Sequence, residues 1–170
     1  MKAKAPLTGI KVLDFTRVYS GPYCTMMLAD LGAEVVKVER KGIGDDTHHF
    51  APVKDGESAY FTYLNRNKKS IGLNLKSEEG VKIVKEMAGW ADIVVENFSP
   101  GVVDKLGIGY KDLKEVNPRI IYGSISGFGQ TGPYRKKPAY DVVCQAMGGF
   151  MNLTGEKDGK PYKLGPSIVD

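Results

Sequence analysis

The chain has 170 residues, a usual length for one domain, with a modest net charge of +4 and 21 glycines and 9 prolines that indicate many loops. The charge permits an anionic ligand, but the sequence lacks the dense basic stripe of a nucleic-acid-binding protein and any apolar run of the roughly 20 residues that a membrane span needs. The N-terminus has no apolar signal-peptide core. Cys24 and Cys144 lie far apart without metal-ligand spacing, so we expect no disulfide scaffold, no metal site and a reducing, cytoplasmic setting.

Strand and helix patterns alternate along the chain. The expected strands are 10–15, 34–39, 70–75, 91–96, 120–126 and 164–169. The expected helices are 21–31, 59–64, 78–90, a short one after Pro100, 110–116 and 141–147. Glu78–Trp90 is the clearest amphipathic helix, with Ser77 as its N-cap. This alternation predicts an α/β fold with a parallel sheet, helices on both faces, and ligands beyond the carboxyl ends of the strands. No linker divides the chain.

Residues 127–132 read GFGQTG, a literal G-x-G-x-x-G sequence after an expected strand. In dinucleotide-binding proteins these glycines open a helix whose N-terminus meets the pyrophosphate. Pro133 and Pro138 follow here, so we interpret residues 127–138 as a surface loop. Such a loop can still approach a ligand closely, because glycine has no side chain.

Several polar residues allow two interpretations. The basic clusters are Arg66, Lys68 and Lys69, and Arg135, Lys136 and Lys137. They are either solvated loops, the simpler interpretation, or contacts to a phosphorylated ligand. His48 and His49 lack convergent partners, so a loop or packing role is favoured over metal binding. Asp170 ends the expected strand 164–169, where α/β sheets place chemistry, although an ordinary strand-end residue is the simpler interpretation.

Long stretches of the chain, taken together and in order, resemble the class III CoA-transferases of the CaiB/BaiF type. The stretches are LTGIKVLDFTRVYSGPYCTMMLADLGAEVVKVER (7–40), GIGDDT (42–47), AYFTYLNRNKKSIGLNLK (59–76), ADIVVENFSPGVVDKLGIGY (91–110), NPRIIYGSISGFGQTGPY (117–134) and AYD (139–141). The family includes formyl-CoA transferase, carnitine CoA-transferase and α-methylacyl-CoA racemase relatives. The resemblance implies a Rossmann-like large domain, of which residues 1–170 would be the CoA-binding N-terminal part. The small domain and the C-terminal return would lie outside this chain.

The resemblance also implies which residues contact CoA, which is here a substrate as free CoA or acyl-CoA. These residues are Val18, Tyr19, Arg40, Leu73, Asn74, Leu75, Lys76, Asn97, Phe98, Lys105 and Lys137. The segment 65–69 would accompany them. Lys105 stands where an arginine contacts CoA in the formyl-CoA enzyme, which keeps the charge without the bidentate grip.

By the same resemblance, Asp170 is the catalytic nucleophile and Tyr140 lines the acyl pocket. The implied reaction moves CoA from an acyl-CoA to a small carboxylic acid through an aspartyl anhydride and an aspartyl-CoA thioester. The full-length enzyme would be an intertwined homodimer, with no nucleic-acid or membrane partner. In racemase relatives a histidine occupies the position of Tyr140, and an unperturbed tyrosine, with a pKa of about 10, is a poor base near neutral pH.

Two alternatives stay open at this point: a 2-methylacyl-CoA racemase on the same fold, and a truncated, non-catalytic CoA-binding fragment. Relatives continue beyond Asp170 into a glycine-rich loop that encloses the site. We therefore expect the 170-residue chain alone to be inactive, because water would reach a reactive anhydride.

Overall fold

The computed structural model describes residues 5–170, which group into two compact units divided after Ile125. Residues around this point carry no linker signal, so sequence patterns do not predict the division. Each unit is described by itself. The placement of residues 1–170 in one CoA-binding large domain stays a prediction.

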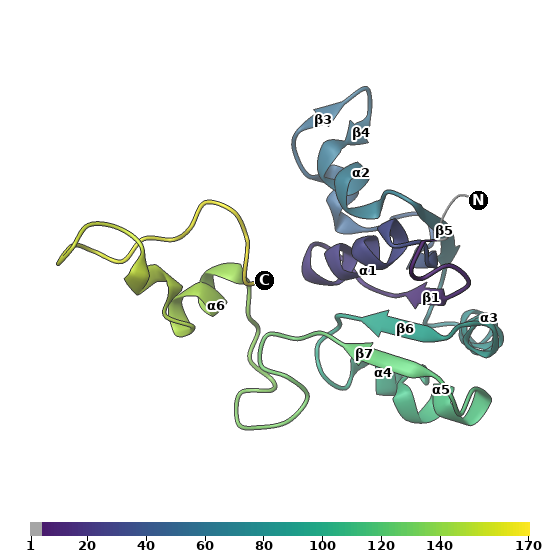
Figure 1. Cartoon of the computed structure of the whole chain (residues 1–170). Helices are drawn as coiled ribbons and strands as arrows, with labels where there is room; N and C mark the ends of the chain where they lie inside the picture. The colour runs from purple at the N-terminus through teal and green to yellow at the C-terminus, as the bar shows by residue number, and fades with distance from the viewer. Residues whose placement is uncertain (1–4) are drawn as a thin grey trace. The chain divides into compact units, whose positions relative to one another are not determined.

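The first unit is built on a five-stranded parallel sheet with the strand order β5-β2-β1-β6-β7 (Figure 1). Its strands are β1 (Lys11–Asp14), β2 (Glu34–Arg40), β5 (Lys68–Leu73), β6 (Ile93–Glu96) and β7 (Ile121–Ser124). The chain builds outward from β1 through β2 to β5 and then crosses to β6 on the other side of β1. Such a reversal marks the point where open parallel sheets bind their ligands, at the carboxyl ends of the strands.

Helices cover both faces of this sheet, as predicted. On one face α1 (Ser20–Asp30) packs Ala29 against Val12 and Val35. On the other, α3 (Glu78–Trp90) and α5 (Tyr110–Val116) pack Val84 and Leu113 against Leu13. Val12 and Leu13 are neighbours in β1, and successive strand residues point to opposite faces, so one strand serves both cores. The bounds of α3 and α5 agree with the prediction, and α4 (Val102–Lys105) lies between β6 and α5.

The segment between β2 and β5 holds more structure than predicted. It contains η1 (Asp46–His49), the hairpin of β3 (Val53–Lys54) and β4 (Glu57–Ser58), and α2 (Ala59–Asn65). Asp55 and Gly56 join β3 to β4 with φ angles of 52° and 83°, the left-handed conformation that two-residue hairpin turns require. This hairpin is absent from the elements predicted above, although the Asp-Gly dipeptide indicates it.

The second unit contains α6 (Asp141–Met147), with the predicted bounds, and η2 (Phe150–Leu153). The predicted strand 164–169 is wrong. Side chains of α6 bind the backbone there: Gln145 Oε1 accepts from Leu164 N at 2.8 Å and Asp141 Oδ1 accepts from Val169 N at 3.1 Å. These bonds take the place of a strand ladder, to which Pro166 has no N–H to contribute. Asp170 is therefore not at the end of a strand.

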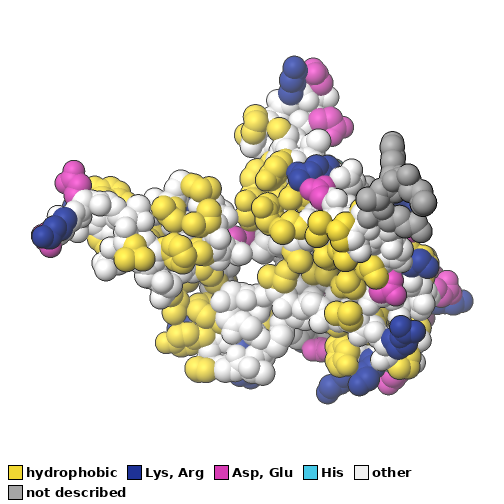
Figure 2. Space-filling view, viewed as in Figure 1, with side chains coloured by type: hydrophobic (Ala, Val, Ile, Leu, Met, Phe, Trp, Pro, Cys, Tyr) yellow, Lys and Arg dark blue, Asp and Glu magenta, His cyan; other side chains and the backbone are white. Residues whose placement is uncertain are grey.

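Exposed apolar side chains gather over α1 and α2 of the first unit (Figure 2). Among them are Tyr23 and Met27 of α1 and Tyr63 of α2, with exposed fractions of 38%, 49% and 51%. Within residues 5–170, no helix combines the length and the apolar character that crossing a bilayer would take.

Candidate functional site

The carboxyl edge of the sheet collects most of the positions that the resemblance implies as CoA contacts. They are Val18 and Tyr19 after β1, Arg40 at the end of β2, Leu73–Lys76 at and after the end of β5, and Asn97 and Phe98 after β6. Because the strands are parallel, these positions share one edge, on both sides of the reversal at β1. Lys105 ends α4, the first helix after β6, whereas Lys137, Tyr140 and Asp170 belong to the second unit.

The loop after β1 is clamped to the loop after β6 by one side chain. Asn97 accepts a hydrogen bond from Arg17 N through Oδ1 and donates one from Nδ2 to Arg17 O, both at 2.8 Å. The next residue, Val18, has a φ of 66°, an unfavourable conformation for a β-branched residue. Surrounding bonds must hold such a residue in place, and strain of this kind is often found at ligand sites.

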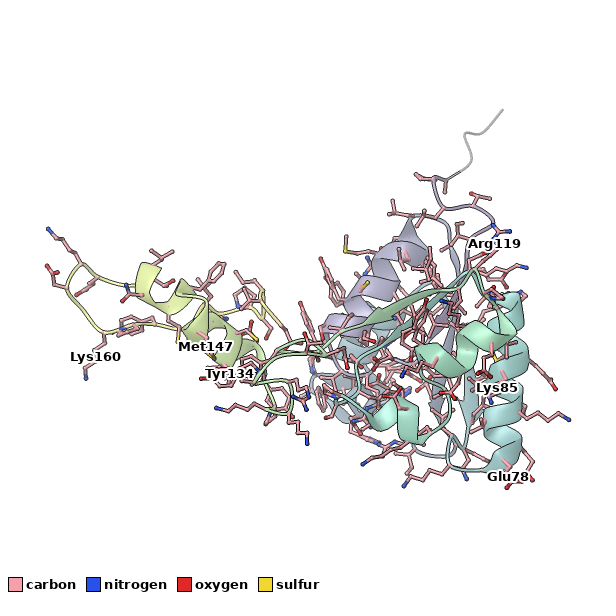
Figure 3. The ribbon with its side chains drawn as sticks, turned by 90° about the horizontal axis from the view of Figure 1, so that it is seen from below. Glu78, Lys85, Arg119, Tyr134, Met147 and Lys160 are labelled. Atoms are coloured by element: carbon pink, nitrogen blue, oxygen red, sulfur yellow. The ribbon has the colours of Figure 1, made fainter. Side chains whose placement is uncertain are left out.

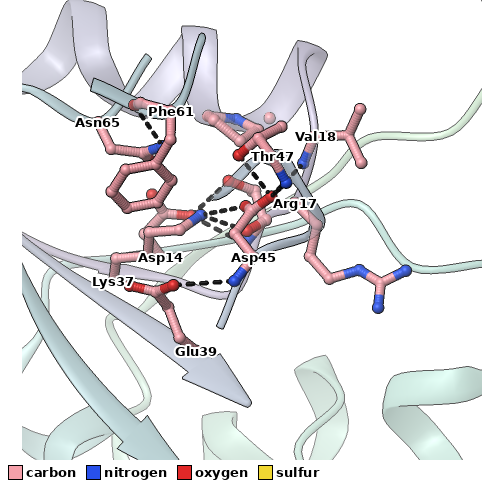
Figure 4. A network of polar contacts seen from close by, with 12 residues as sticks. Asp14, Arg17, Val18, Lys37, Glu39, Asp45, Thr47, Phe61 and Asn65 are labelled. Carbon is pink, nitrogen blue, oxygen red and sulfur yellow. Dashed lines mark hydrogen bonds and ion pairs between the residues drawn. The ribbon is translucent and has the colours of Figure 1, made fainter. Parts of the chain in front are cut away.

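A buried ion pair supplies part of that hold (Figure 4). Lys37 of β2 and Asp45 are 1% and 2% exposed, and Lys37 Nζ lies 2.9 Å from Asp45 Oδ2. Lys37 Nζ also donates to Thr16 O at 2.7 Å, and Val18 N donates to Asp45 Oδ1 at 3.3 Å. Burial acts to raise the pKa of Asp45, but Lys37 and the bonds from Thr47 hold it below its usual value. The pair therefore fixes the backbone of the loop after β1 (residues 15–19, the first loop) on both sides of Arg17.

A second buried pair lies beside the first. Asp14, at the end of β1, accepts from Thr16 N at 2.8 Å and from Thr25 Oγ1 of α1 at 2.6 Å. Lys68 of β5 approaches Asp14 Oδ2 to 3.2 Å, and both side chains are almost fully buried. Burial lowers the pKa of Lys68, against the opposing effect of Asp14. Gly21 permits this arrangement, because a Cβ there would lie 2.4 Å from Thr16 Cβ.

The interpretation of Arg66, Lys68 and Lys69 as a solvated loop is therefore wrong for Lys68. Lys69 Nζ is paired with Glu34 at 2.6 Å, and Arg66 is paired with Asp30. Lys68 is a structural cation of the first loop, and the other two are engaged with carboxylates of the protein. These pairings do not support the interpretation that residues 65–69 contact a phosphorylated ligand.

The loop after β5 is a tight turn against the first turn of α3. Lys76 N donates to Asn74 Oδ1 at 3.1 Å, and Ser77 caps the helix by accepting from Gly80 N at 3.1 Å. A Cβ on Gly80 would lie 2.0 Å from Asn74 O, so only glycine allows this approach. The turn opens onto a groove of about 790 Å³ beside α3, and Leu75, Lys76 and Lys105 are among the residues that line it. Figure 3 shows α3 with Glu78 and Lys85, which also line the groove.

Sequence patterns do not single out two titratable side chains of the sheet, Glu96 of β6 and Tyr122 of β7. Glu96, at the end of β6, is 2% exposed and accepts from Phe98 N at 2.8 Å. Burial raises the pKa of Glu96, partly offset by bonds from Ser124 and Phe98. Burial and the nearby Glu96 also raise the pKa of Tyr122. The position of Glu96 at the end of a strand can be read from the sequence, but its burial cannot.

His48 has the packing role that the sequence favoured. Its ring stacks on Phe61 with 3.6 Å between the centroids, and its Nε2 lies 2.9 Å from Glu39 Oε2. Burial acts to raise the pKa of Glu39, but the bonds from Ser70 and His48 hold it below its usual value. Glu39 also accepts from Asp45 N at 2.9 Å, so this group supports the same first loop.

In the second unit, Asp170 and Tyr140 are brought close by the start of α6. Asp170 Oδ1 accepts from Asp141 N at 3.0 Å, and Asp141 directly follows Tyr140. Asp141 is buried and its Oδ2 accepts from Gln145 Nε2 at 2.6 Å, whereas Tyr140 is 72% exposed. Lys137 lies over the ring of Tyr134, 4.1 Å from its centroid. Residues 127–138 form neither a helix nor a strand, which agrees with the loop interpretation of GFGQTG.

Known proteins are similar to this chain in sequence and fold. Residues 7–170 match CoA-transferase family III. The chain belongs to this family. It is 51% identical over 166 residues to succinyl-CoA:glutarate CoA-transferase of Mus musculus, covering 97% of this chain and 38% of that protein. It is also 51% identical to formyl-CoA:oxalate CoA-transferase of Escherichia coli, covering 97% of this chain and 40% of that protein. A crystal structure of a CAIB/BAIF family protein from Brucella suis superposes with a TM-score of 0.92 at 44% identity, over 98% of this chain and 45% of that one.

The chain thus spans about 40% of the length of these named relatives. The roles of individual site residues stay predictions.

Proposed function

We propose that this chain is the CoA-binding part of an enzyme that transfers CoA from an acyl-CoA to a small dicarboxylic acid. The observation that carries the proposal is the set of predicted CoA positions at one sheet edge, where buried ion pairs hold the loop after β1 in place. Preorganised loops of this kind bind a ligand at little further entropic cost. Two relatives named above act on glutarate or oxalate, each a dicarboxylic acid, which supports the acceptor class.

The proposed chemistry begins at Asp170. Its carboxylate attacks the thioester carbonyl, which forms an acyl-aspartyl anhydride and releases CoA thiolate. The thiolate attacks the aspartyl carbonyl, giving an aspartyl-CoA thioester and the free acid of the donor. The acceptor carboxylate then displaces the thiolate to form a second anhydride. Attack of the thiolate on the acceptor carbonyl yields the new acyl-CoA and regenerates Asp170.

The contacts of Asp170 suit this role. The hydrogen bond from Asp141 N orients the carboxylate, and Asp141 is itself fixed by its buried contact with Gln145. Tyr140 is exposed beside this group and can line the acyl pocket or donate a hydrogen bond to a developing oxyanion. The exposed apolar side chains over α1 and α2 support the proposed homodimer of the full-length enzyme, because such patches mark interfaces.

The test is to trap the intermediate. The protein, in a version that includes the C-terminal region present in its relatives, is incubated with succinyl-CoA and treated with hydroxylamine. The modified residue is then mapped by mass spectrometry. We expect the label on Asp170, its loss in Asp170→Ala, and full labelling in Asp158→Asn, which removes another carboxylate from the same unit. A label on another carboxylate, or wild-type turnover in Asp170→Ala, would refute the assignment.

The same preparation decides between transfer and racemisation. Incubation of a 2-methylacyl-CoA in deuterium oxide should give no deuterium at the α-carbon at catalytic rates. Deuterium incorporation at such rates would favour the racemase alternative. We expect the 170-residue chain alone to be inactive. If it turned over substrate as fast as the longer version, this expectation would be refuted.

A further inference from the structure

Arg17 occupies the middle of the site, although the family resemblance assigned it no role. Its backbone N–H and carbonyl are both bonded to Asn97, so the base of its side chain is fixed. Its guanidinium lies 5.9 Å from the ring centroid of Phe98 and 3.7 Å from Asp46 Oδ2. Figure 4 shows this side chain pointing away from the buried network beneath it. Arg17 thus lies among three predicted CoA contacts: Val18, Asn97 and Phe98.

Asp46 is shared by two arginines. Its Oδ1 lies 2.7 Å from Arg40 Nη2, whereas its Oδ2 is 3.7 Å from Arg17 Nη2, which is longer than a hydrogen bond. The side chains of Arg17, Arg40 and Asp46 are 40%, 48% and 39% exposed. Exposed ion pairs of this kind contribute little, because water screens them. Two cations facing one carboxylate leave a positive charge without compensation within this cluster.

We propose that Arg17 binds a phosphate group of CoA together with Arg40, and that Asp46 holds the two guanidiniums in place until the phosphate replaces it. This inference rests on the proposed function, because it requires CoA to lie along the carboxyl edge. It adds a residue to the CoA site and gives that site a resident counter-ion.

The chemistry favours a phosphate as the ligand. A guanidinium presents paired N–H donors whose geometry matches two phosphate oxygens, and Arg17 has no 2.7 Å bond to Asp46 that it must break. The Phe98 ring lies 5.9 Å from the guanidinium carbon, within the range of a cation–π contact, and uses none of the guanidinium N–H donors. CoA offers a diphosphate and a 3′-phosphate, and either would carry more negative charge than Asp46.

The test measures CoA binding to the chain by isothermal titration calorimetry. Arg17→Gln should weaken binding by roughly tenfold to a hundredfold, the usual range for one charge-assisted hydrogen bond. Arg17→Lys should retain only part of the affinity, because it keeps the charge without the fork. Asp46→Asn should bind CoA several-fold more tightly than wild type. Arg119→Gln removes an exposed arginine from the turn before β7 and should have no effect. Figure 3 shows Arg119 at the opposite end of the unit from Glu78.

Related ligands identify the group that Arg17 recognises. An Arg17→Gln effect that persists with dephospho-CoA assigns the diphosphate, and one that vanishes assigns the 3′-phosphate. An equal effect with pantetheine, which has no phosphate, would overturn the inference. Equal CoA affinity of wild type and Arg17→Gln, with unchanged circular dichroism, would also overturn it, and weaker binding by Asp46→Asn would refute the counter-ion role. Failure of the wild-type chain to bind CoA at all would instead refute the proposed function and this inference with it.

Discussion

Replacing Lys37 with methionine isolates the energetic contribution of the buried ion pair beneath the first loop. Methionine keeps much of the length of the side chain but removes the charge that lies 2.9 Å from Asp45. Asp45 would then be a buried carboxylate without its cation, and Thr16 O would lose its donor at 2.7 Å. Breaking one partner of a buried pair costs about 3–5 kcal/mol. Since a domain of this kind is stable by only about 5–15 kcal/mol, Lys37→Met should remove a large share of that stability.

Urea unfolding followed by tryptophan fluorescence measures this loss in the right unit, because Trp90 is the only tryptophan and ends α3 of the first unit. Lys82→Met makes the same replacement at an exposed position of α3 and should change the unfolding free energy by no more than about 0.5 kcal/mol. In the double variant Lys37→Met, Asp45→Asn, the buried charge is gone as well. Its loss of unfolding free energy should be smaller than the sum of the losses in the two single variants.

The pH dependence gives a second check on the same pair. The pKa of Asp45 is lower in the folded protein than in the unfolded chain. Its contribution to stability is therefore present above the unfolded value, near 3.8, and is lost as the pH falls through the folded value. The stability gap between wild type and Lys37→Met should narrow at acid pH. A loss no larger than that of Lys82→Met at pH 7, or a gap that widens on acidification, would refute the reasoning.

Two further substitutions test the other loops. Gly80→Ala should destabilise the chain by about 1–3 kcal/mol and weaken CoA binding, because the new Cβ would lie 2.0 Å from Asn74 O. Gly89→Ala in the same helix places its Cβ 3.8 Å from the nearest atom and should stabilise the chain by up to about 1 kcal/mol. The urea midpoints of the two variants check this, and equal midpoints would contradict it. Glu96→Gln should raise the melting temperature at pH 7 more than at pH 5. The folded pKa of Glu96 is raised, so wild type loses stability as the pH rises from about 4.5 through that value, while the amide still accepts from Phe98 N; a lower melting temperature at pH 7 would count against it.

Much of the fold could be predicted because local sequence and global packing agree. The helix Glu78–Trp90 has a capping serine, acidic residues in its first turn and apolar residues at helical spacing, and its predicted bounds agree with the structure. The parallel sheet followed from strands that alternate with helices. Residues 164–169 show the limit of such patterns. Their apolar run resembles a strand, but side chains of Asp141 and Gln145, distant in sequence, bind its backbone instead.

The buried charges could not be predicted from the sequence. Lys37 stands in a strand whose alternation suggests an exposed lysine, and its burial depends on Asp45 in a loop beyond the strand. Lys68 belongs to a basic run that is usually solvated, and its partner Asp14 lies more than fifty residues earlier in the chain. Sequence position gives no sign of either pairing. Lys68 meets Asp14 only when β5 and β1 lie on the two sides of β2, and Lys37 meets Asp45 only across the loop that follows β2.

The site therefore depends on two sets of residues, of which only the first can be predicted from the sequence. Residues placed at strand ends, such as Val18 and Asn97, follow from the resemblance and the strand order. The charges that hold them come from three neighbouring strands and from Asp45 in the loop after β2, so the shape of the first loop is determined by the assembled sheet and not by the loop itself. The strained φ of Val18 requires this, since no local preference of valine would keep it there. Arg17 is the outward part of the same arrangement: its backbone is fixed by Asn97, and its guanidinium is left facing Asp46, where an anionic ligand can reach it.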